Sequence, residues 1–250
     1  MPPEGTLLPE TFVLQRGANR QGILDMMAAE QRKLLDRLWE TRKADLPLKT
    51  AADAIVLASI VEKETGRNDE RERVAAVFVN RLKRNMRLQS DPTILYGIFG
   101  GKVVWGKPIL RSEISQRTQH NTYQIDGLPP TPICNPGRAA IEAVLNPADT
   151  KELYFVADGN GGHTFSETLK EHNAGVQRWR SVEKEMKARQ GEPEPPAAPE
   201  KGKGKAAARP APPAETGSSE KGTPSAPKKL NAAPPGAWSA TTNPSAKKAE

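Results

Sequence analysis

Apolar residues recur at helical spacing in the first part of the chain. Ile23, Met27, Leu34 and Leu38 fall on one side of a helix, because intervals of four and seven residues return to the same face. The segment before Gly17 instead has the character of a loop that leads into a short strand. The pattern therefore predicts a short strand followed by a helix with one buried face.

Residues 54–61 are apolar on every side, unlike the amphipathic helix before them. Such a helix is expected at the centre of a fold. Thr50, followed three residues later by Asp53, predicts a capping box at its start, and Gly66 marks its natural end. This longest apolar run is far shorter than the roughly 20 residues that span a bilayer, so the chain as written shows neither a transmembrane helix nor a signal peptide.

The remaining pattern predicts shorter helices and one hairpin. The helices are expected at about residues 69–85, 91–96, 112–117, 135–146 and from about 168 onward. Two β-prone segments flank the turn residues 159–162, which predicts a β-hairpin. The fold class is therefore α+β and helix-dominated, with small β elements that include a hairpin near residues 153–166.

A change in composition sets the domain boundary. Residues 191–250 hold twelve of the 23 prolines, and Leu230 and Trp238 are their only large apolar residues. Such a segment cannot bury enough apolar surface to offset the entropy of ordering. We therefore expect one folded domain in residues 1–190 and a disordered Pro/Ala/Lys-rich tail in residues 191–250.

Charge and cysteine content exclude several classes of function. The formal net charge is +7, but the tail carries nine Lys/Arg against six Asp/Glu, and charges of both signs alternate elsewhere, as in residues 70–73. This is typical of solvated helix faces and does not favour a nucleic-acid partner. Cys134 is the only cysteine and there are three histidines without metal-ligand spacing, so neither a metal site nor a cofactor is expected.

Glu62 is the polar residue that fits its surroundings least. It follows Ile55 and Ala58 at intervals of three and four along the most apolar helix. Desolvation and the negative end of the helix macrodipole would both raise the pKa of Glu62, as a general acid for glycosidic cleavage requires. The alternatives are a side chain that turns outward or a structural ion pair with a nearby Lys or Arg.

The segment Ala-Ser-Ile-Val-Glu-Lys-Glu-Thr at residues 58–65 closely resembles the signature of the endolytic murein transglycosylase family, also called YceG-like. Further segments that resemble family motifs follow in family order: Glu4-Gly5, residues 77–82, residues 87–93, residues 121–133 and residues 163–173. The resemblance covers about residues 4–178.

The resemblance implies a lyase that cleaves nascent peptidoglycan strands between N-acetylmuramic acid (MurNAc) and N-acetylglucosamine (GlcNAc), leaving 1,6-anhydroMurNAc ends. It implies that Glu62, the first glutamate of the motif, is the catalytic acid and base. It also implies action at the periplasmic face of the bacterial inner membrane, with peptidoglycan synthases as candidate partners. Family members typically carry a membrane helix and a LysM-like module before the catalytic domain. Because the opening motif here begins at Glu4, we expect both to be absent from this chain.

Four further residues are candidates for substrate binding. The amides of Gln89 and Asn121 could bind sugar hydroxyls and the ring of Tyr123 could stack on a sugar, or each could satisfy groups of its own loop. Asp91 could contact substrate, but its place in Ser90-Asp91-Pro92 favours helix capping. Two rival functions stay open: a hydrolytic, lysozyme-like muramidase that uses Glu62 with a second carboxylate such as Asp91, and a non-catalytic glycan-binding protein.

Overall fold

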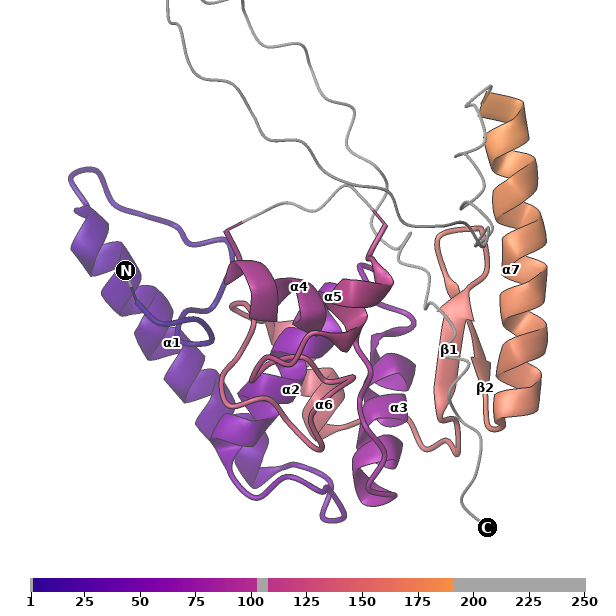
Figure 1. Ribbon diagram of the computed structural model, residues 1–250. Coiled ribbons are helices and arrows are strands. Elements are labelled where there is room, and N and C mark those ends of the chain that lie inside the picture. Colours follow the sequence, from indigo (N-terminus) through magenta and orange to yellow (C-terminus); the bar gives the residue numbers. More distant parts are fainter. Residues whose placement is uncertain (1, 103–107, 191–250) are drawn as a thin grey trace, which may run out of the picture.

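The computed structural model describes residues 2–102 and 108–190, so the predicted tail at residues 191–250 lies outside the described residues. The helices and strands are, in chain order, α1 Arg20–Glu40, α2 Ala51–Glu64, α3 Arg71–Lys83, α4 Asp91–Phe99, α5 Arg111–Ser115, α6 Arg138–Leu145, β1 Tyr154–Ala157, β2 His163–Ser166 and α7 Leu169–Gln190 (Figure 1). The helix-dominated α+β class is confirmed.

Helix α2 lies at the centre of the fold, as its uniform apolar character predicts. Residues 54–61 are all buried. The predicted capping box is present, because Thr50 Oγ1 accepts a hydrogen bond from the amide of Asp53, whose carboxylate accepts one from the amide of Thr50. The box fixes where the helix starts.

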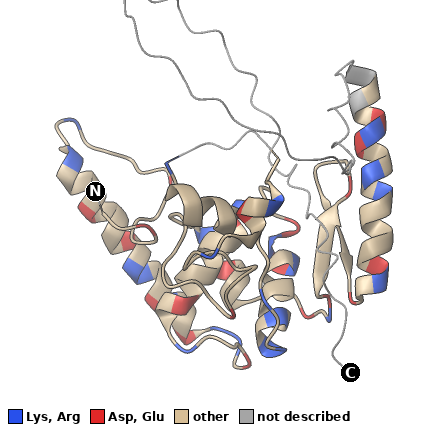
Figure 2. Cartoon of the chain, in the orientation of Figure 1, with Lys and Arg blue, Asp and Glu red and all other residues tan. Residues whose placement is uncertain are grey.

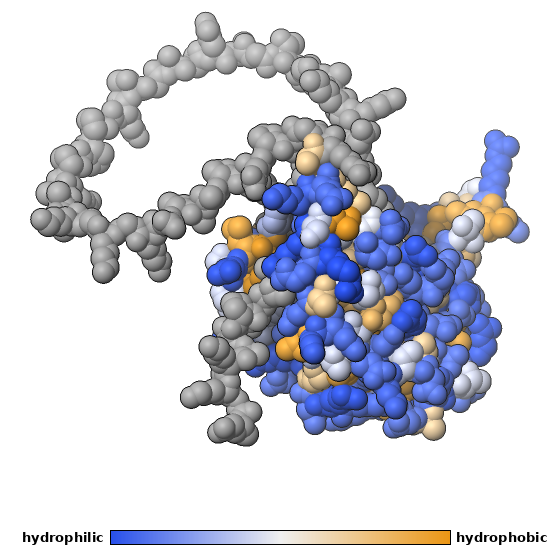
Figure 3. Space-filling view, turned by 90° about the vertical axis from the view of Figure 1, so that its right-hand side faces the viewer, coloured by the Kyte–Doolittle hydropathy of each residue, from blue (hydrophilic) through white to orange (hydrophobic). Residues whose placement is uncertain are grey.

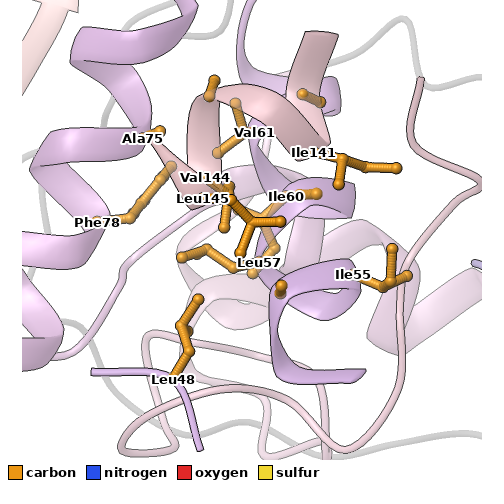
Figure 4. Packing of buried hydrophobic residues seen from close by; sticks show 14 of the residues in the cluster. Leu48, Ile55, Leu57, Ile60, Val61, Ala75, Phe78, Ile141, Val144 and Leu145 are labelled. Atoms are coloured by element: carbon orange, nitrogen blue, oxygen red, sulfur yellow. The ribbon is translucent and has the colours of Figure 1, made fainter. Parts of the chain in front are cut away.

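The core forms where α2, α3 and α6 meet (Figure 4). Leu57 and Ile60 of α2 are fully buried and pack with Val144 of α6 and Phe78 of α3. Burying each large side chain contributes roughly 1.5–3 kcal/mol relative to leaving it in water. This packing holds the end of α2 rigidly beside the starts of α4 and α6.

The predicted hairpin is also confirmed. Strands β1 and β2 pair antiparallel, with Phe155 opposite Phe165. Helix α7 packs on both strands, and β1 contacts α3 through an edge-to-face pair of Phe78 and Phe155, whose ring centroids are 5.8 Å apart. The hairpin and α7 thus form a layer beside α3 (Figure 1). The outer face of this layer is mostly hydrophilic, with scattered apolar residues (Figure 3).

The short strand predicted before Gly17 is wrong. In the described ranges 2–102 and 108–190, the two strands of the hairpin are the only ones, and residues 11–15 form an irregular segment. Val13 is 96% exposed and Leu14 is 46% exposed. A strand needs a partner for its backbone groups, and no neighbouring strand supplies one here.

Charged residues of both signs alternate along the described helices rather than gathering in one basic stripe (Figure 2). Across the part of the chain that the structure describes, no helix is long and apolar enough to cross a membrane.

Candidate active site

The two glutamates at the end of α2 face different parts of the molecule. They are two positions apart, so their side chains leave the helix on nearly opposite sides. Glu62 Oε2 accepts a hydrogen bond of 3.1 Å from the amide of Gly137, the N-cap residue of α6. Glu64 Oε1 accepts one of 2.6 Å from the hydroxyl of Ser90, the N-cap residue of α4. Each glutamate therefore connects α2 to the start of a different helix.

Glu62, the residue favoured by the sequence pattern, is half-buried. Its carboxylate lies at the N-terminal end of α6, where free amides and the helix dipole attract a negative charge. This contact explains why a carboxylate is tolerated beside the core. The catalytic role of Glu62 stays a prediction.

Glu64 lies in a more unusual environment. It keeps some exposure to solvent, but the surrounding protein desolvates its carboxyl group and raises the pKa of Glu64 to about 8. The hydrogen bond from Ser90 and the charge of Arg81 lower that pKa, whereas the charge of Asp91 raises it. Desolvation dominates, so the side chain holds a proton at neutral pH.

Asp91 is the second carboxyl group of this site. It is 9% exposed, and its Oδ1 accepts a hydrogen bond of 2.6 Å from the hydroxyl of Tyr123. Desolvation raises the pKa of Asp91 to about 6, and the Tyr123 hydrogen bond opposes the rise. The predicted capping role is wrong: Ser90 occupies the N-cap position of α4, its side chain makes no cap hydrogen bond, and Asp91 is bound to Tyr123 instead.

Arg81 of α3 brings a positive charge to the same cluster. Its guanidinium donates hydrogen bonds to the carbonyls of Leu153 (2.7 Å) and Leu88 (3.0 Å) and lies over the ring of Tyr154, 5.1 Å from the centroid. It also donates to Gln89 Oε1 at 3.3 Å. Burial lowers the pKa of Arg81, yet the group stays charged because an arginine pKa starts so high.

Gln89 has a backbone φ of +53°, in a region that residues other than glycine rarely adopt. Such strain persists only where the surrounding contacts enforce it, and it gathers at functional sites. Here the amide of Gln89 donates to the carbonyl of Thr122, and its side chain contacts Arg81. Of the predicted substrate-binding residues, Gln89, Asp91 and Tyr123 therefore lie in one cluster.

Asn121 has a different role in the structure. It is 1% exposed, and its side-chain amide donates to the carbonyls of Ile114 (3.0 Å) and Gln116 (2.7 Å). Its Oδ1 accepts from the amide of Tyr123 at 3.0 Å. These contacts favour the alternative in which Asn121 satisfies its own loop. The ring of Tyr123 is likewise only 8% exposed, so the geometry favours its hydroxyl, rather than stacking, as the functional part.

The sequence pattern missed Glu64 and Arg81 as members of this cluster. Both glutamates follow the same apolar run, and periodicity alone does not say which polar loop covers each side of a helix end. Arg81 offered only a weak signal in the sequence, because it follows the apolar residues Phe78 and Val79 on α3. The structure shows that Arg81 is buried with them and is 8% exposed. The cluster forms only when α2, α3 and α4 meet.

Two histidines near the hairpin have structural contacts. His163 Nδ1 lies 2.8 Å from Glu70 Oε2, and His172 stacks on the ring of Tyr154 with centroids 5.2 Å apart. Within the described residues, no group of three or more His, Cys, Asp or Glu side chains could hold a metal ion.

Comparison with known proteins places this geometry in a family context. A protein of Bacillus subtilis (strain 168) named endolytic murein transglycosylase is 34% identical over 187 residues, which make up 74% of this chain and 50% of the relative. A protein of the same name from Streptococcus pneumoniae (serotype 2, strain D39) is 33% identical over 164 residues, covering 65% of this chain and 29% of the relative. The chain thus spans half or less of the length of these relatives.

A solved structure agrees with these matches. The crystal structure of a putative YceG-like protein from Listeria monocytogenes matches with a TM-score of 0.56 at 33% identity, over 68% of this chain and 54% of that chain. The model of the YceG-like family matches residues 1–178, which include every element from α1 to the hairpin and the whole carboxyl cluster. The chain belongs to the YceG-like family.

Proposed function

We propose that this chain is the catalytic part of an endolytic peptidoglycan lytic transglycosylase, a lyase. It would cleave the MurNAc–GlcNAc bond of nascent glycan strands without water and leave 1,6-anhydroMurNAc ends. One observation carries the proposal: the carboxyl group of Glu64 is enclosed by protein at the end of α2 and accepts a hydrogen bond from Ser90 at 2.6 Å, in a cluster where Asp91 and Arg81 act on its charge and desolvation raises its pKa. The names of the relatives from Bacillus subtilis and Streptococcus pneumoniae support the choice of substrate.

The reaction needs one carboxyl group with two successive tasks. Glu64 first donates its proton to the glycosidic oxygen while the bond to C1 of MurNAc breaks and an oxocarbenium-like centre develops. Its carboxylate then takes the proton of the C6 hydroxyl while that oxygen bonds to C1. Glu64 ends the cycle protonated, so the reaction consumes no water and needs no second catalytic carboxylate.

The neighbours of Glu64 suit both tasks. A general acid is most effective when its pKa lies near the working pH, and a pKa of about 8 keeps Glu64 protonated at pH 7. The positive charge of Arg81 stabilises the carboxylate that forms after proton transfer. Gln89, Asp91 and Tyr123 stay candidates for contacts to the sugars, and Asn121 is the least suited because its amide is already bonded.

Location and partners follow only from the substrate and the family. Peptidoglycan strands are assembled outside the cytoplasmic membrane, so we propose action there, at the periplasmic face of the inner membrane in a two-membrane cell. Peptidoglycan synthases, which make the proposed substrate, are the corresponding candidate partners.

The presence of Asp91 beside Glu64 supports one competing function, a hydrolytic muramidase. In such enzymes a second carboxylate activates water or attacks C1. Asp91 is 9% exposed and accepts a hydrogen bond from Tyr123, which leaves it poorly placed to activate water or to attack C1. We therefore favour the lytic reaction.

Product chemistry tests the proposal directly. The chain is incubated with purified glycan strands, and the products are digested and analysed by mass spectrometry. We expect fragments with 1,6-anhydroMurNAc ends, which are lighter by one water than reducing ends. Reducing ends would show a hydrolase, and binding without new ends would show a non-catalytic glycan-binding protein.

A further inference from the structure

The hydroxyl of Ser90 is held against one oxygen of the proposed catalytic carboxyl. Ser90 Oγ donates to Glu64 Oε1 at 2.6 Å, a short hydrogen bond. Ser90 is 1% exposed, and within the described residues it is the hydrogen-bonding partner of this carboxyl group. Water cannot readily replace a donor that lies so deep.

A closed network of buried groups fixes the position of Ser90. Its amide donates to Thr122 Oγ1 at 2.9 Å, and its carbonyl accepts from Thr93 Oγ1 at 2.6 Å. The two threonine hydroxyls lie 2.8 Å apart, and the amide of Thr122 donates to Thr93 Oγ1 at 3.1 Å. Both threonines are 0% exposed. Residues on two loops and the first turn of α4 therefore hold one hydroxyl in place.

The backbone before Ser90 adds to this constraint. Gln89 adopts its φ of +53° immediately before the serine, and its amide donates to the carbonyl of Thr122 at 3.2 Å. A cap hydrogen bond would be the ordinary use of a serine at this position, because Ser is a preferred N-cap residue. The side chain of Ser90 makes none and is turned to Glu64 instead. The departure from ordinary capping points to a role at the carboxyl group.

We propose that Ser90 is the positioning residue of the acid, holding Oε1 of Glu64 so that Oε2 carries the proton that is exchanged with the substrate. The proposal rests on the function proposed above. The Oε2 proton goes to the glycosidic oxygen as its bond to C1 breaks, and the C6 hydroxyl proton returns to Oε2 as the new C1–O6 bond forms. Ser90 keeps its own proton and its bond to Oε1 throughout.

Ser90 also affects the charge balance of the site. A donor to a carboxyl oxygen stabilises the ionised form, and the Ser90 hydrogen bond lowers the pKa of Glu64 against the larger effect of desolvation. The other charged groups that act on Glu64 are Asp91 and Arg81, with opposite effects. Removing the hydroxyl while keeping both charges should therefore move the basic limb of the pH–rate profile to higher pH.

The test compares Ser90→Ala with Ser90→Thr, which keeps a hydroxyl. Cleavage of glycan strands by Ser90→Ala should show a kcat about tenfold to a hundredfold lower, as misplacement of a reacting group commonly causes, with KM changed less than about twofold. Its basic limb should shift upward, and Ser90→Thr should restore most of kcat. A fall in kcat without a shift of the limb, or an unchanged kcat, would overturn the proposal.

The matched control is Ser59→Ala, which also removes a buried hydroxyl. Ser59 is 0% exposed, and its hydroxyl donates to the carbonyl of Val56 at 2.7 Å and accepts from the amide of Ile133 at 3.0 Å, so both of its partners are backbone groups. This variant should lower stability but leave the basic limb in place.

A readout that needs no turnover separates this proposal from the proposed function. The titration of the Glu64 side-chain carboxyl is followed by carbon-13 NMR in the wild-type chain and in Ser90→Ala. An upward shift in Ser90→Ala supports the coupling even if the wild-type chain cleaves no glycan. An unchanged titration overturns the proposal even if the glycan is cleaved.

Discussion

At the scale of single residues, the catalytic assignment depends on two glutamates two positions apart. Glu62 accepts a hydrogen bond from the amide of Gly137, and Glu64 accepts one from Ser90 beside a second carboxyl group. The first contact anchors a helix end, whereas the second surrounds a carboxyl with groups that control its proton. The two environments therefore predict different outcomes for the same substitution.

We expect Glu64→Gln to lower the rate of glycan cleavage by at least about a hundredfold. General acid–base catalysis typically contributes a factor of about 10²–10⁴, and an amide has no acidic proton to give to the glycosidic oxygen. Glu62→Gln is the matched control. Its amide oxygen can still accept from Gly137, so most of the activity should remain. Both rates are measured by the release of new glycan ends, with folding checked by circular dichroism. A large loss in Glu62→Gln alone would instead establish the assignment suggested by the sequence.

The raised pKa of Glu64 also predicts a pH dependence of stability. The carboxyl binds its proton more tightly in the folded state, with a pKa of about 8, than in the unfolded state, where the pKa is near 4.5. Between these values the folded state holds more protons, so this group's contribution to the free energy of unfolding falls as pH rises from about 5 to 8. The slope from one group is at most about 1.4 kcal/mol per pH unit.

Urea denaturation between pH 6 and 8.5 measures this effect. Asp91, with a pKa of about 6, also makes the free energy of unfolding fall as pH rises, but mainly below pH 6. The slope of the wild-type protein between pH 6.5 and 8 therefore reports Glu64 rather than Asp91. Glu64→Gln should flatten the slope and raise stability at pH 8. An equal slope in wild type and variant would show that Glu64 titrates normally.

At the scale of elements, the start of α2 determines whether the end of α2 is well placed. The capping box of Thr50 and Asp53 fixes the first turn, and the fourteen residues of the helix then carry Glu64 to the cluster. Because the helix is buried along residues 54–61, a displacement of its first turn would also displace Glu64 at its end.

Replacing Thr50 with alanine should lower the free energy of unfolding by about 1 kcal/mol, the usual effect of losing an N-cap side chain. The control is Thr41→Ala, at the C-cap of α1, where the threonine hydroxyl caps no free amide and contacts helix carbonyls at 3.3 and 3.5 Å. Chemical denaturation compares the two. Equal effects would show that the box contributes nothing specific.

At the scale of the whole molecule, one helical core and one hairpin layer assemble the site from distant parts of the sequence. Arg81 reaches the carbonyl of Leu153 beside the hairpin, while Tyr123 reaches Asp91 on α4. The cluster therefore depends on contacts that α2, α3 and α4 make with one another, with the loop of Tyr123 and with the segment before β1, and disruption of the hairpin layer would disturb the acid.

The C-terminal residues 191–250 lie outside the described part of the chain. We predict that they are dispensable for folding and for glycan cleavage. Deleting them should leave the unfolding midpoint and glycan cleavage nearly unchanged, because Leu230 and Trp238 are the only large apolar side chains that the segment could pack. Any change should appear in binding to anionic surfaces and should weaken as salt rises. Amide hydrogen exchange is the measurement: protection there as strong as in residues 54–61 would place the tail within the fold.

Local patterns in the sequence determined most of the architecture. The uniform apolar run of α2, its capping box and the glycine-rich turn of the hairpin act over a few residues, so their physical signals can be read directly along the chain. The ordered motifs likewise indicated the family. The strand predicted before Gly17 failed because a strand depends on a partner, and a partner is not a local property.

The identity of the proposed acid was decided by the tertiary structure. Desolvation of Glu64, the turn of Ser90 away from capping, and the pairing of Asp91 with Tyr123 depend on contacts between distant segments: Ser90 lies 26 residues after Glu64, and Tyr123 lies 32 residues after Asp91. Helical spacing placed Glu62 and Glu64 on opposite sides of α2 but could not say what would cover each side. A pKa depends on everything within a few ångströms in space, and only the folded chain determines which groups those are.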